Sequence, residues 1–188
     1  NSASLSFIEK GQPAPAESTP LKTQTAYFAG GCFWGTEDLF QRTPGVIDAV
    51  SGYMGGKTAN PTYKDVCNHD TGHAETVKIT FDPATVTYAQ LLKAFFTYHD
   101  PTQLNRQGPD VGDQYRSAIF ASSAEQYDEA MKFIERQGQR KRFAGKKIVT
   151  QVSLAEKAGP FYPAEEYHQD YHEKHGGHCA MPVKDEDE

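Results

Sequence analysis

Cysteine is scarce in this chain, which holds three cysteines in 188 residues. Cys32, Cys67 and Cys179 are too few and too far apart to form a disulfide framework. No two of them form a Cys-x-x-Cys pair, so the sequence offers neither a thioredoxin-type motif nor a zinc knuckle. An odd number of cysteines points to thiol chemistry instead.

Long apolar runs and an excess of basic residues are also lacking. No run approaches the roughly 20 apolar residues that span a bilayer, and nothing near the N-terminus resembles a secretory signal, so we expect no membrane segment. A net charge of −6 argues against nucleic-acid binding, because a phosphate backbone attracts basic surfaces. We interpret the basic cluster at 140–147 as the solvated end of a helix. We expect a cytoplasmic protein, and an exported mature form stays open because the chain starts at Asn1 without methionine.

The chain is long enough for one domain with a substantial core and one active site. We expect an extended, proline-punctuated N-terminal arm over residues 1–22, a catalytic α+β domain over 23–165, and a flexible C-terminal segment over 166–188. The polar stretch 102–114 is long for a connection, which predicts a functional or disordered loop. We expect the protein to be a monomer.

Apolar periodicity predicts the order strand, helix, strand, strand, helix, strand, helix, strand within this domain. This order favours an α+β two-layer sandwich with a ferredoxin-like β-α-β-β-α-β core plus extra elements. The predicted strands cover residues 25–29, 46–53, 76–81, 117–121 and 148–154, and the predicted helices cover 36–42, 88–99 and 123–142.

The run Gly30-Gly31-Cys32-Phe33-Trp34-Gly35 places a cysteine where a strand gives way to a helix. Backbone N–H groups at a helix start favour a thiolate by about 0.3 to 1 kcal/mol, less than one pKa unit, while Glu37 and Asp38 oppose a negative sulfur. Cys32 therefore needs further activation, from other residues or from substrate. The alternative is a cysteine packed as a small apolar residue. The paired glycines favour the reactive thiol, because they remove side chains where a substrate would approach.

Two further segments carry groups suited to acid chemistry. Glu75, in Gly72-His73-Ala74-Glu75, stands where a strand begins, and burial there would raise its pKa and make it a general acid. A solvent-exposed carboxylate at a strand end is the alternative. If Glu75 faces Cys32, the two groups share one proton, which gives a nucleophile beside an acid. The loop 106–117, with Asp110 and Tyr115, is by itself only weak evidence for a part of the active site.

Together these segments resemble the peptide methionine sulfoxide reductase A family. The resemblance covers about residues 23–179. It rests on four short motifs in the same order: Gly31–Gly35, Gly72–Glu75, Asp100–Gln103 and Gln114–Ser117.

The resemblance implies a thiol-dependent reduction of methionine S-sulfoxide, free or in proteins. Cys32 would attack the sulfoxide sulfur while Glu75 protonates the departing oxygen, leaving methionine and a cysteine sulfenic acid. Tyr63 and Tyr115 would donate hydrogen bonds to the sulfoxide oxygen. Neither a metal nor an organic cofactor is implied.

Substrate binding and recycling follow from the same resemblance. Phe33 and Trp34 would form the pocket for the methyl group, and Asp110 would hold the substrate's main-chain N–H or a water molecule. Cys179, beside two glycines, is the candidate resolving cysteine, and thioredoxin would reduce the resulting disulfide with Cys32. Cys67 has no required role and is interpreted as structural.

Two other readings stay open at this point. A zinc module would use residues on a surface helix, and a thiol hydrolase would pair Cys32 with a histidine base. The candidate zinc ligands are His168, His172, His175, His178 and Cys179. The candidate bases are His73, His99 and His168.

Overall fold

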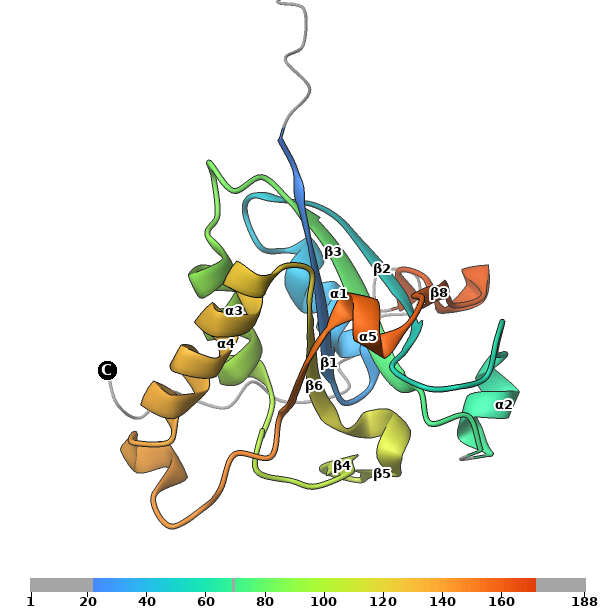
Figure 1. Cartoon of the computed structure of the whole chain (residues 1–188). Coiled ribbons are helices and arrows are strands. Elements are labelled where there is room, and N and C mark those ends of the chain that lie inside the picture. The colour runs from blue at the N-terminus through green and yellow to red at the C-terminus, as the bar shows by residue number, and fades with distance from the viewer. Residues whose placement is uncertain (1–21, 69, 172–188) are drawn as a thin grey trace, which may run out of the picture.

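A six-stranded sheet forms the centre of the molecule (Figure 1), with strand order β7-β6-β1-β3-β2-β8. The computed structural model describes residues 22–68 and 70–171. The strands are β1 (Gln24–Gly30), β2 (Val46–Met54), β3 (Ala74–Phe81), β6 (Ser117–Ala121), β7 (Gln151–Leu154) and β8 (Tyr162–Pro163).

The core of this sheet has the predicted ferredoxin-like topology. Helix α1 (Phe33–Gln41) connects β1 to β2, and helix α3 (Tyr88–Tyr98) leads from β3 towards β6. Strand β3 lies between β1 and β2, and β1 lies between β3 and β6, with every one of these neighbours antiparallel. Strand β7 adds to β6 in parallel, and β8 adds to β2 at the other edge. The predicted α+β fold class is confirmed.

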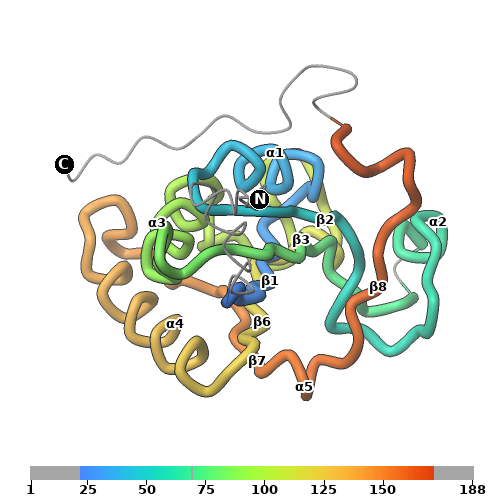
Figure 2. The backbone as a smooth tube through the Cα atoms, turned by 90° about the horizontal axis from the view of Figure 1, so that it is seen from above, coloured from blue at the N-terminus to red at the C-terminus, as the bar shows by residue number. Residues whose placement is uncertain are grey.

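Side chains of the sheet alternate between two apolar cores. The larger core packs Phe28 and Ile79 against α1, α3 and α4 (Ala124–Gln137), and the smaller one packs Ala29 and Phe120 beneath α5 (Ala155–Ala158). Figure 2 shows α3 and α4 on one side of the sheet and α5 on the other. Each fully buried Phe or Leu contributes roughly 1.5 to 3 kcal/mol, so the larger core carries most of the stabilisation.

Helix α3 follows from its sequence with little change. Its start is a capping box, in which the Thr87 hydroxyl accepts the Gln90 N–H and the Gln90 side chain accepts the Thr87 N–H. Its apolar stripe is buried, as the periodicity predicts: Leu91, Leu92, Phe95 and Phe96.

The predicted helix over 123–142 is too long. Helix α4 ends at Gln137, and the basic cluster that follows is not its solvated end. The Arg142 guanidinium donates instead to two carbonyl oxygens at the end of α3, those of Phe96 at 2.7 Å and His99 at 3.0 Å. A cation at a helix C-terminus is stabilising, so Arg142 anchors this connection to α3.

Two predictions about strands are corrected at the C-terminal end of the domain. The strand expected from residue 148 begins only at Gln151. It is also not the last strand, because β8 follows it and pairs with β2 through Gly52 and Tyr53. The chain thus returns to the far edge of the sheet after α5.

The polar stretch 102–114 is ordered. It forms a hairpin of β4 (Arg106–Gln107) and β5 (Asp110–Val111), followed by a 3-10 turn, η1 (Asp113–Tyr115). The Gln107 amide holds the base of this stretch, accepting the Asp100 N–H and donating to the Asp100 carbonyl, both at 2.9 Å.

The packed part of the chain continues past residue 165. A 3-10 turn, η3 (Glu166–His168), places His168 at 1% exposure, and Gln169 and Asp170 bond to β2 and α1. These contacts place residues 166–171 with the domain, so the expected boundary moves towards the C-terminus. The N-terminal arm up to residue 21 and the segment beyond 171 lie outside the described residues, and their separation from the domain stays a prediction. In the described part of the chain, no helix is long and apolar enough to cross a bilayer.

Candidate active site

Cys32 occupies the N-cap position of α1, directly after β1, as its sequence predicts. The two preceding glycines serve packing rather than substrate approach. A Cβ on Gly30 would lie 2.7 Å from the Phe95 ring, and one on Gly31 would lie 2.8 Å from Gln107 Cγ. Gly31 also has φ +94°, which a side chain disfavours. The glycines therefore allow α3 and the β4–β5 hairpin to lie close to the cysteine.

Glu75 lies in the second position of β3 and is 2% exposed, so the solvent-exposed alternative is wrong. The Phe33 N–H donates to Glu75 Oε1 at 3.3 Å. Phe33 follows Cys32 in the chain, and this bond therefore holds the carboxyl at the start of α1, beside the thiol.

Tyr115, the last residue of η1, brings the other candidates together electrostatically. Burial raises the pKa of its hydroxyl well above the ordinary value, and the charges of Glu75, Asp110, Cys67 and Cys32 raise the pKa further. The hydroxyl thus stays protonated at neutral pH and acts as a hydrogen-bond donor.

Tyr63 begins the short helix α2 (Tyr63–Cys67), which lies between β2 and β3 in the chain. Burial is the largest cause that raises the pKa of its hydroxyl. A hydrogen bond with Cys67 and the charges of Tyr115 and Glu75 raise the pKa further. The two tyrosines therefore lie in one site and both keep their protons. Cys67 belongs to this site as well, although the sequence assigns it no role.

Asp110, on β5, is half-buried, and desolvation raises the pKa of its carboxyl. Its charge is one of the causes that raise the pKa of Tyr115. Cys179 lies outside the described residues.

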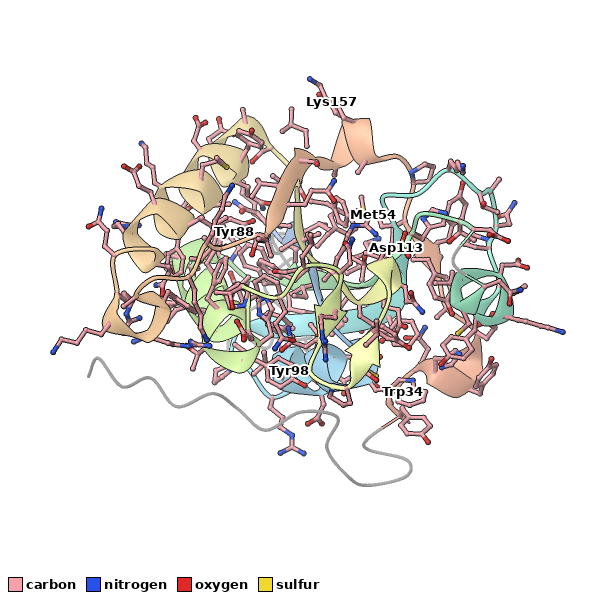
Figure 3. The ribbon with its side chains drawn as sticks, turned by 90° about the horizontal axis from the view of Figure 1, so that it is seen from below. Trp34, Met54, Tyr88, Tyr98, Asp113 and Lys157 are labelled. Atoms are coloured by element: carbon pink, nitrogen blue, oxygen red, sulfur yellow. The ribbon has the colours of Figure 1, made fainter. Side chains whose placement is uncertain are left out.

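Phe33 and Trp34 form an aromatic wall behind Cys32. Phe33 is fully buried, and its ring lies 6.4 Å from that of Trp34 and 5.7 Å from that of Tyr53. Figure 3, which labels Trp34, shows its indole at the rim of the domain. Tyr171 stacks on it with a centroid distance of 3.7 Å and an interplanar angle of 9°.

The contacts on the C-terminal side of this wall were not predicted from the sequence. The Trp34 Nε1–H donates to His168 Nδ1 at 3.0 Å, and the His168 ring packs 4.4 Å from that of Tyr63. Glu165 accepts the Tyr63 N–H at 2.8 Å and the Tyr53 hydroxyl at 3.1 Å. A density of aromatic residues and histidine over 161–171 was the available signal.

The surface helix expected around His168 is wrong. Among the residues described up to 170, the stretch around His168 forms the turn η3, and Asp170 has φ +56°, outside the helical region. Tertiary hydrogen bonds to Glu165 and Asp170 hold this stretch in an irregular course. His168 consequently points inward, and burial lowers its pKa.

The three candidate histidine bases are committed to other bonds. His73 accepts the Gly56 N–H and bonds to the Thr58 carbonyl, and His99 bonds to the Phe95 carbonyl and the Ser117 hydroxyl. Burial lowers the pKa of His99 to about 4. His168 accepts from Trp34, so the thiol-hydrolase reading finds no support.

The zinc hypothesis also lacks support within residues 22–68 and 70–171, where no three His, Cys, Asp or Glu side chains are arranged to hold a metal ion. The remaining candidate ligands lie outside the described residues: His172, His175, His178 and Cys179.

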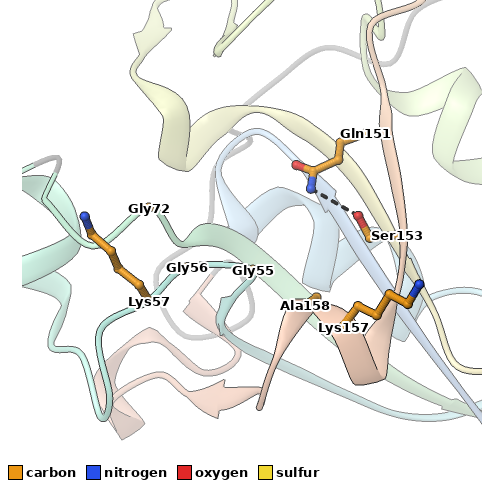
Figure 4. A pocket seen from close by; sticks show the side chains of 8 residues that line it. All are labelled: Gly55, Gly56, Lys57, Gly72, Gln151, Ser153, Lys157 and Ala158. Carbon is orange, nitrogen blue, oxygen red and sulfur yellow. Dashed lines mark hydrogen bonds between the residues drawn. The ribbon is translucent and has the colours of Figure 1, made fainter.

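A hollow of about 500 Å³ lies apart from this site, between the turn after β2 and helix α5. Figure 4 shows the side chains of Lys57 and Lys157 on its rim, pointing in different directions. None of the predicted catalytic residues lines it.

A thiol at a helix start, beside a buried acid and two protonated tyrosines, defines a thiol-dependent enzyme. Comparison with known proteins specifies the class. The family model described as peptide methionine sulfoxide reductase matches residues 24–188. The peptide methionine sulfoxide reductase MsrA of Geobacter sulfurreducens is 51% identical over 161 residues, covering 86% of this chain and 96% of the relative.

Solved structures agree with this result. Methionine sulfoxide reductase A of Corynebacterium diphtheriae has a TM-score of 0.79 at 38% identity, covering 89% of this chain and 85% of that one. Mxr1 from Saccharomyces cerevisiae in complex with Trx2 has a TM-score of 0.57 at 27% identity, covering 87% and 89%. The chain belongs to the peptide methionine sulfoxide reductase family.

Proposed function

We propose that the protein reduces methionine S-sulfoxide, free or in proteins, with Cys32 as the nucleophile and Glu75 as the general acid. The burial of Glu75 beside the start of α1 is the observation that carries this assignment. A buried carboxyl favours its neutral form, so it holds a proton next to a thiol that must lose one.

The first step transfers oxygen between two sulfur atoms. The Cys32 thiolate attacks the sulfoxide sulfur, Glu75 gives its proton to the departing oxygen, and the net products are methionine and Cys32 sulfenic acid. The substrate sulfur gains two electrons and the cysteine sulfur loses two. Tyr63 and Tyr115 donate to the oxygen as its negative charge grows.

Substrate selection follows from the walls of the site. A sulfoxide has an apolar methyl group on the same sulfur as a strongly accepting oxygen. Phe33 and Trp34 supply the apolar wall for the methyl group, and Asp110 holds the substrate's main-chain N–H or an ordered water molecule. The preference for the S epimer is taken from the family.

Recycling requires a second thiol and an external dithiol. Cys179 condenses with the Cys32 sulfenic acid, forming a disulfide and releasing water. A dithiol such as thioredoxin then reduces this disulfide by exchange, and the complex of Mxr1 with Trx2 supports thioredoxin as the reductant. This cycle suits a reducing compartment, which agrees with the predicted cytoplasmic location. That the protein is a monomer is a separate prediction.

The direct test supplies each epimer of a blocked methionine sulfoxide with dithiothreitol. Turnover of the S epimer supports the proposal, whereas turnover of the R epimer alone, or of neither, refutes it. The variant Cys179→Ser is expected to yield one methionine per enzyme but to stop with thioredoxin as reductant. Sustained thioredoxin-driven turnover by this variant would overturn the role of Cys179.

A further inference from the structure

Glu37 lies behind Cys32 on α1, where the family chemistry gives it no part. Glu37 is 1% exposed, and its carboxylate accepts hydrogen bonds from three residues, two of them outside α1. The donors are the Ser51 hydroxyl on β2, the Gln41 amide at 3.1 Å, and the Asp170 N–H at 2.7 Å. Glu37 therefore joins the helix that carries the thiol to the last residues that the structure describes.

Neighbouring bonds reinforce this junction. The Gln169 amide accepts the Ser51 N–H and donates to the Ser51 carbonyl, both at 2.9 Å, much as a neighbouring strand would. Gln41 donates to the Asp170 carboxylate as well as to Glu37. Asp170 has φ +56°, a conformation that persists in a non-glycine residue only when its surroundings hold it.

The residue after this junction is Tyr171, whose ring stacks on Trp34. One face of the Trp34 indole is thus covered by Tyr171, while its N–H is held by His168. Both contacts come from the segment that Glu37 and Gln169 tie to the domain. The orientation of Trp34 consequently depends on bonds made by Glu37 and by Gln169.

We propose that Glu37 is a positioning residue for the sulfoxide pocket: by binding the Asp170 backbone, it holds Tyr171 against Trp34 and so fixes the aromatic wall. This inference rests on the proposed function for its kinetic consequence, but not for its structural one. The Asp170 N–H needs only an acceptor, and the Glu37 carboxyl provides one whether or not it carries a proton. Burial raises the pKa of Glu37 to about 7, with the Asp170 carboxylate adding to the effect, and the Ser51 and Asp170 donors oppose it.

Three substitutions form a graded series. Glu37→Ala removes all three bonds, Glu37→Gln retains an acceptor for the Asp170 N–H, and Gln41→Ala removes one exposed bridge without touching the core. Asp38→Ala is the matched control, because it removes from the same helix a carboxylate that pairs with Arg42, four residues along.

Trp34 is the only tryptophan, so its fluorescence reports on the wall directly. We expect acrylamide to quench Trp34 most strongly in Glu37→Ala and less strongly in Glu37→Gln and Gln41→Ala. In Asp38→Ala the quenching should equal that of the unchanged protein. The KM for methionine S-sulfoxide should rise about 2- to 12-fold in Glu37→Ala, the worth of one aromatic pair, with a smaller change in kcat.

The fluorescence and kinetic measurements distinguish a failure of the proposed function from a failure of the role of Glu37. An unchanged protein without activity refutes the proposed function but leaves the quenching series valid. A folded Glu37→Ala variant with unchanged quenching and unchanged KM overturns the role of Glu37. Should Glu37→Ala not fold, Gln41→Ala decides, and quenching equal to that of Asp38→Ala would overturn the proposal.

Discussion

Individual residues divide the work of the site between charge and hydrogen bonding. Glu75 is buried beside the helix start, and the two tyrosine hydroxyls keep their protons because burial raises their pKa values. In the proposed mechanism, Glu75 is the proton donor to the sulfoxide oxygen and the two tyrosines are its hydrogen-bond donors. Each contribution is separable by substitution.

The carboxyl of Glu75 can be replaced by an amide of the same shape. Glu75→Gln is expected to slow methionine formation by about 10²- to 10⁴-fold, because an amide cannot deliver a proton to the departing oxygen. Single-turnover assays with dithiothreitol measure this step. Glu156→Gln, in the exposed helix α5, is the control and should react like the unchanged protein. A Glu75→Gln rate within twofold of the control contradicts the acid role.

The tyrosine hydroxyls should act as partners. The double variant Tyr63→Phe with Tyr115→Phe is expected to lose about 10²- to 10³-fold in kcat, the usual effect of removing a donor to a developing oxyanion. Each single variant should lose less, because one donor remains. Tyr127→Phe, on α4, serves as the control. Equal kcat in the double variant and the control would exclude this role.

At the scale of elements, the junction between β1 and α1 determines where the thiol lies. The two glycines before Cys32 let α3 and the β4–β5 hairpin approach it from two sides. A junction built this way tolerates no extra atoms. The packing of α3 and the β4–β5 hairpin against the two glycines, and not the helix dipole alone, therefore determines the position of Cys32.

Gly31→Ala tests this junction. The positive φ costs an alanine roughly 1 to 2 kcal/mol, and its Cβ would lie 2.8 Å from Gln107 Cγ, so both stability and activity should fall. Urea unfolding measures the first effect. Adding Gln107→Ala should relieve the contact but not the backbone strain, leaving part of the loss. A Gly31→Ala variant as stable as the unchanged protein would contradict this account.

Elements with local signals were predictable from the sequence, and those that depend on distant contacts were not. The stripe of α3 and its capping box specify that helix within a dozen residues or so. The end of α4 coincides with Gly138, a local signal, whereas the contact of Arg142 with α3 is one that no local pattern shows. Likewise, His168 suggests a ligand by its spacing, yet its partner is Trp34, 134 residues away. The motifs around Cys32 and Glu75 did identify groups that the fold brings together, while their roles stay predictions.

For the whole molecule, two buried titratable groups set opposing pH dependences. Burial lowers the pKa of His99 from 6.5 to about 4, so the unfolded chain binds the extra proton between these values and stability is lost as pH falls through this window. The pKa of Glu37 is raised from 4.5 to about 7, so its contribution is present at low pH and is lost as pH rises through that range. The two effects oppose each other between about pH 4.5 and 6.5.

Replacing His99 should expose the effect of Glu37. His99→Gln is expected to remove a loss of about 2 kcal/mol in unfolding free energy between pH 7 and pH 5, since each pKa unit is worth about 1.4 kcal/mol. Urea unfolding at the two pH values measures the difference. Identical pH dependence in the variant and the unchanged protein would show that His99 is not held neutral.

The hydrogen bond between Trp34 and His168 also bears on how the site arises during synthesis. Its partners are 134 residues apart, so at roughly 5 to 20 residues per second Trp34 leaves the ribosome about 7 to 27 seconds before His168. The strands that support Cys32 can pair within that interval, but the pocket cannot close. A nascent chain of this protein therefore carries its nucleophile early and gains the complete pocket only near the end of translation.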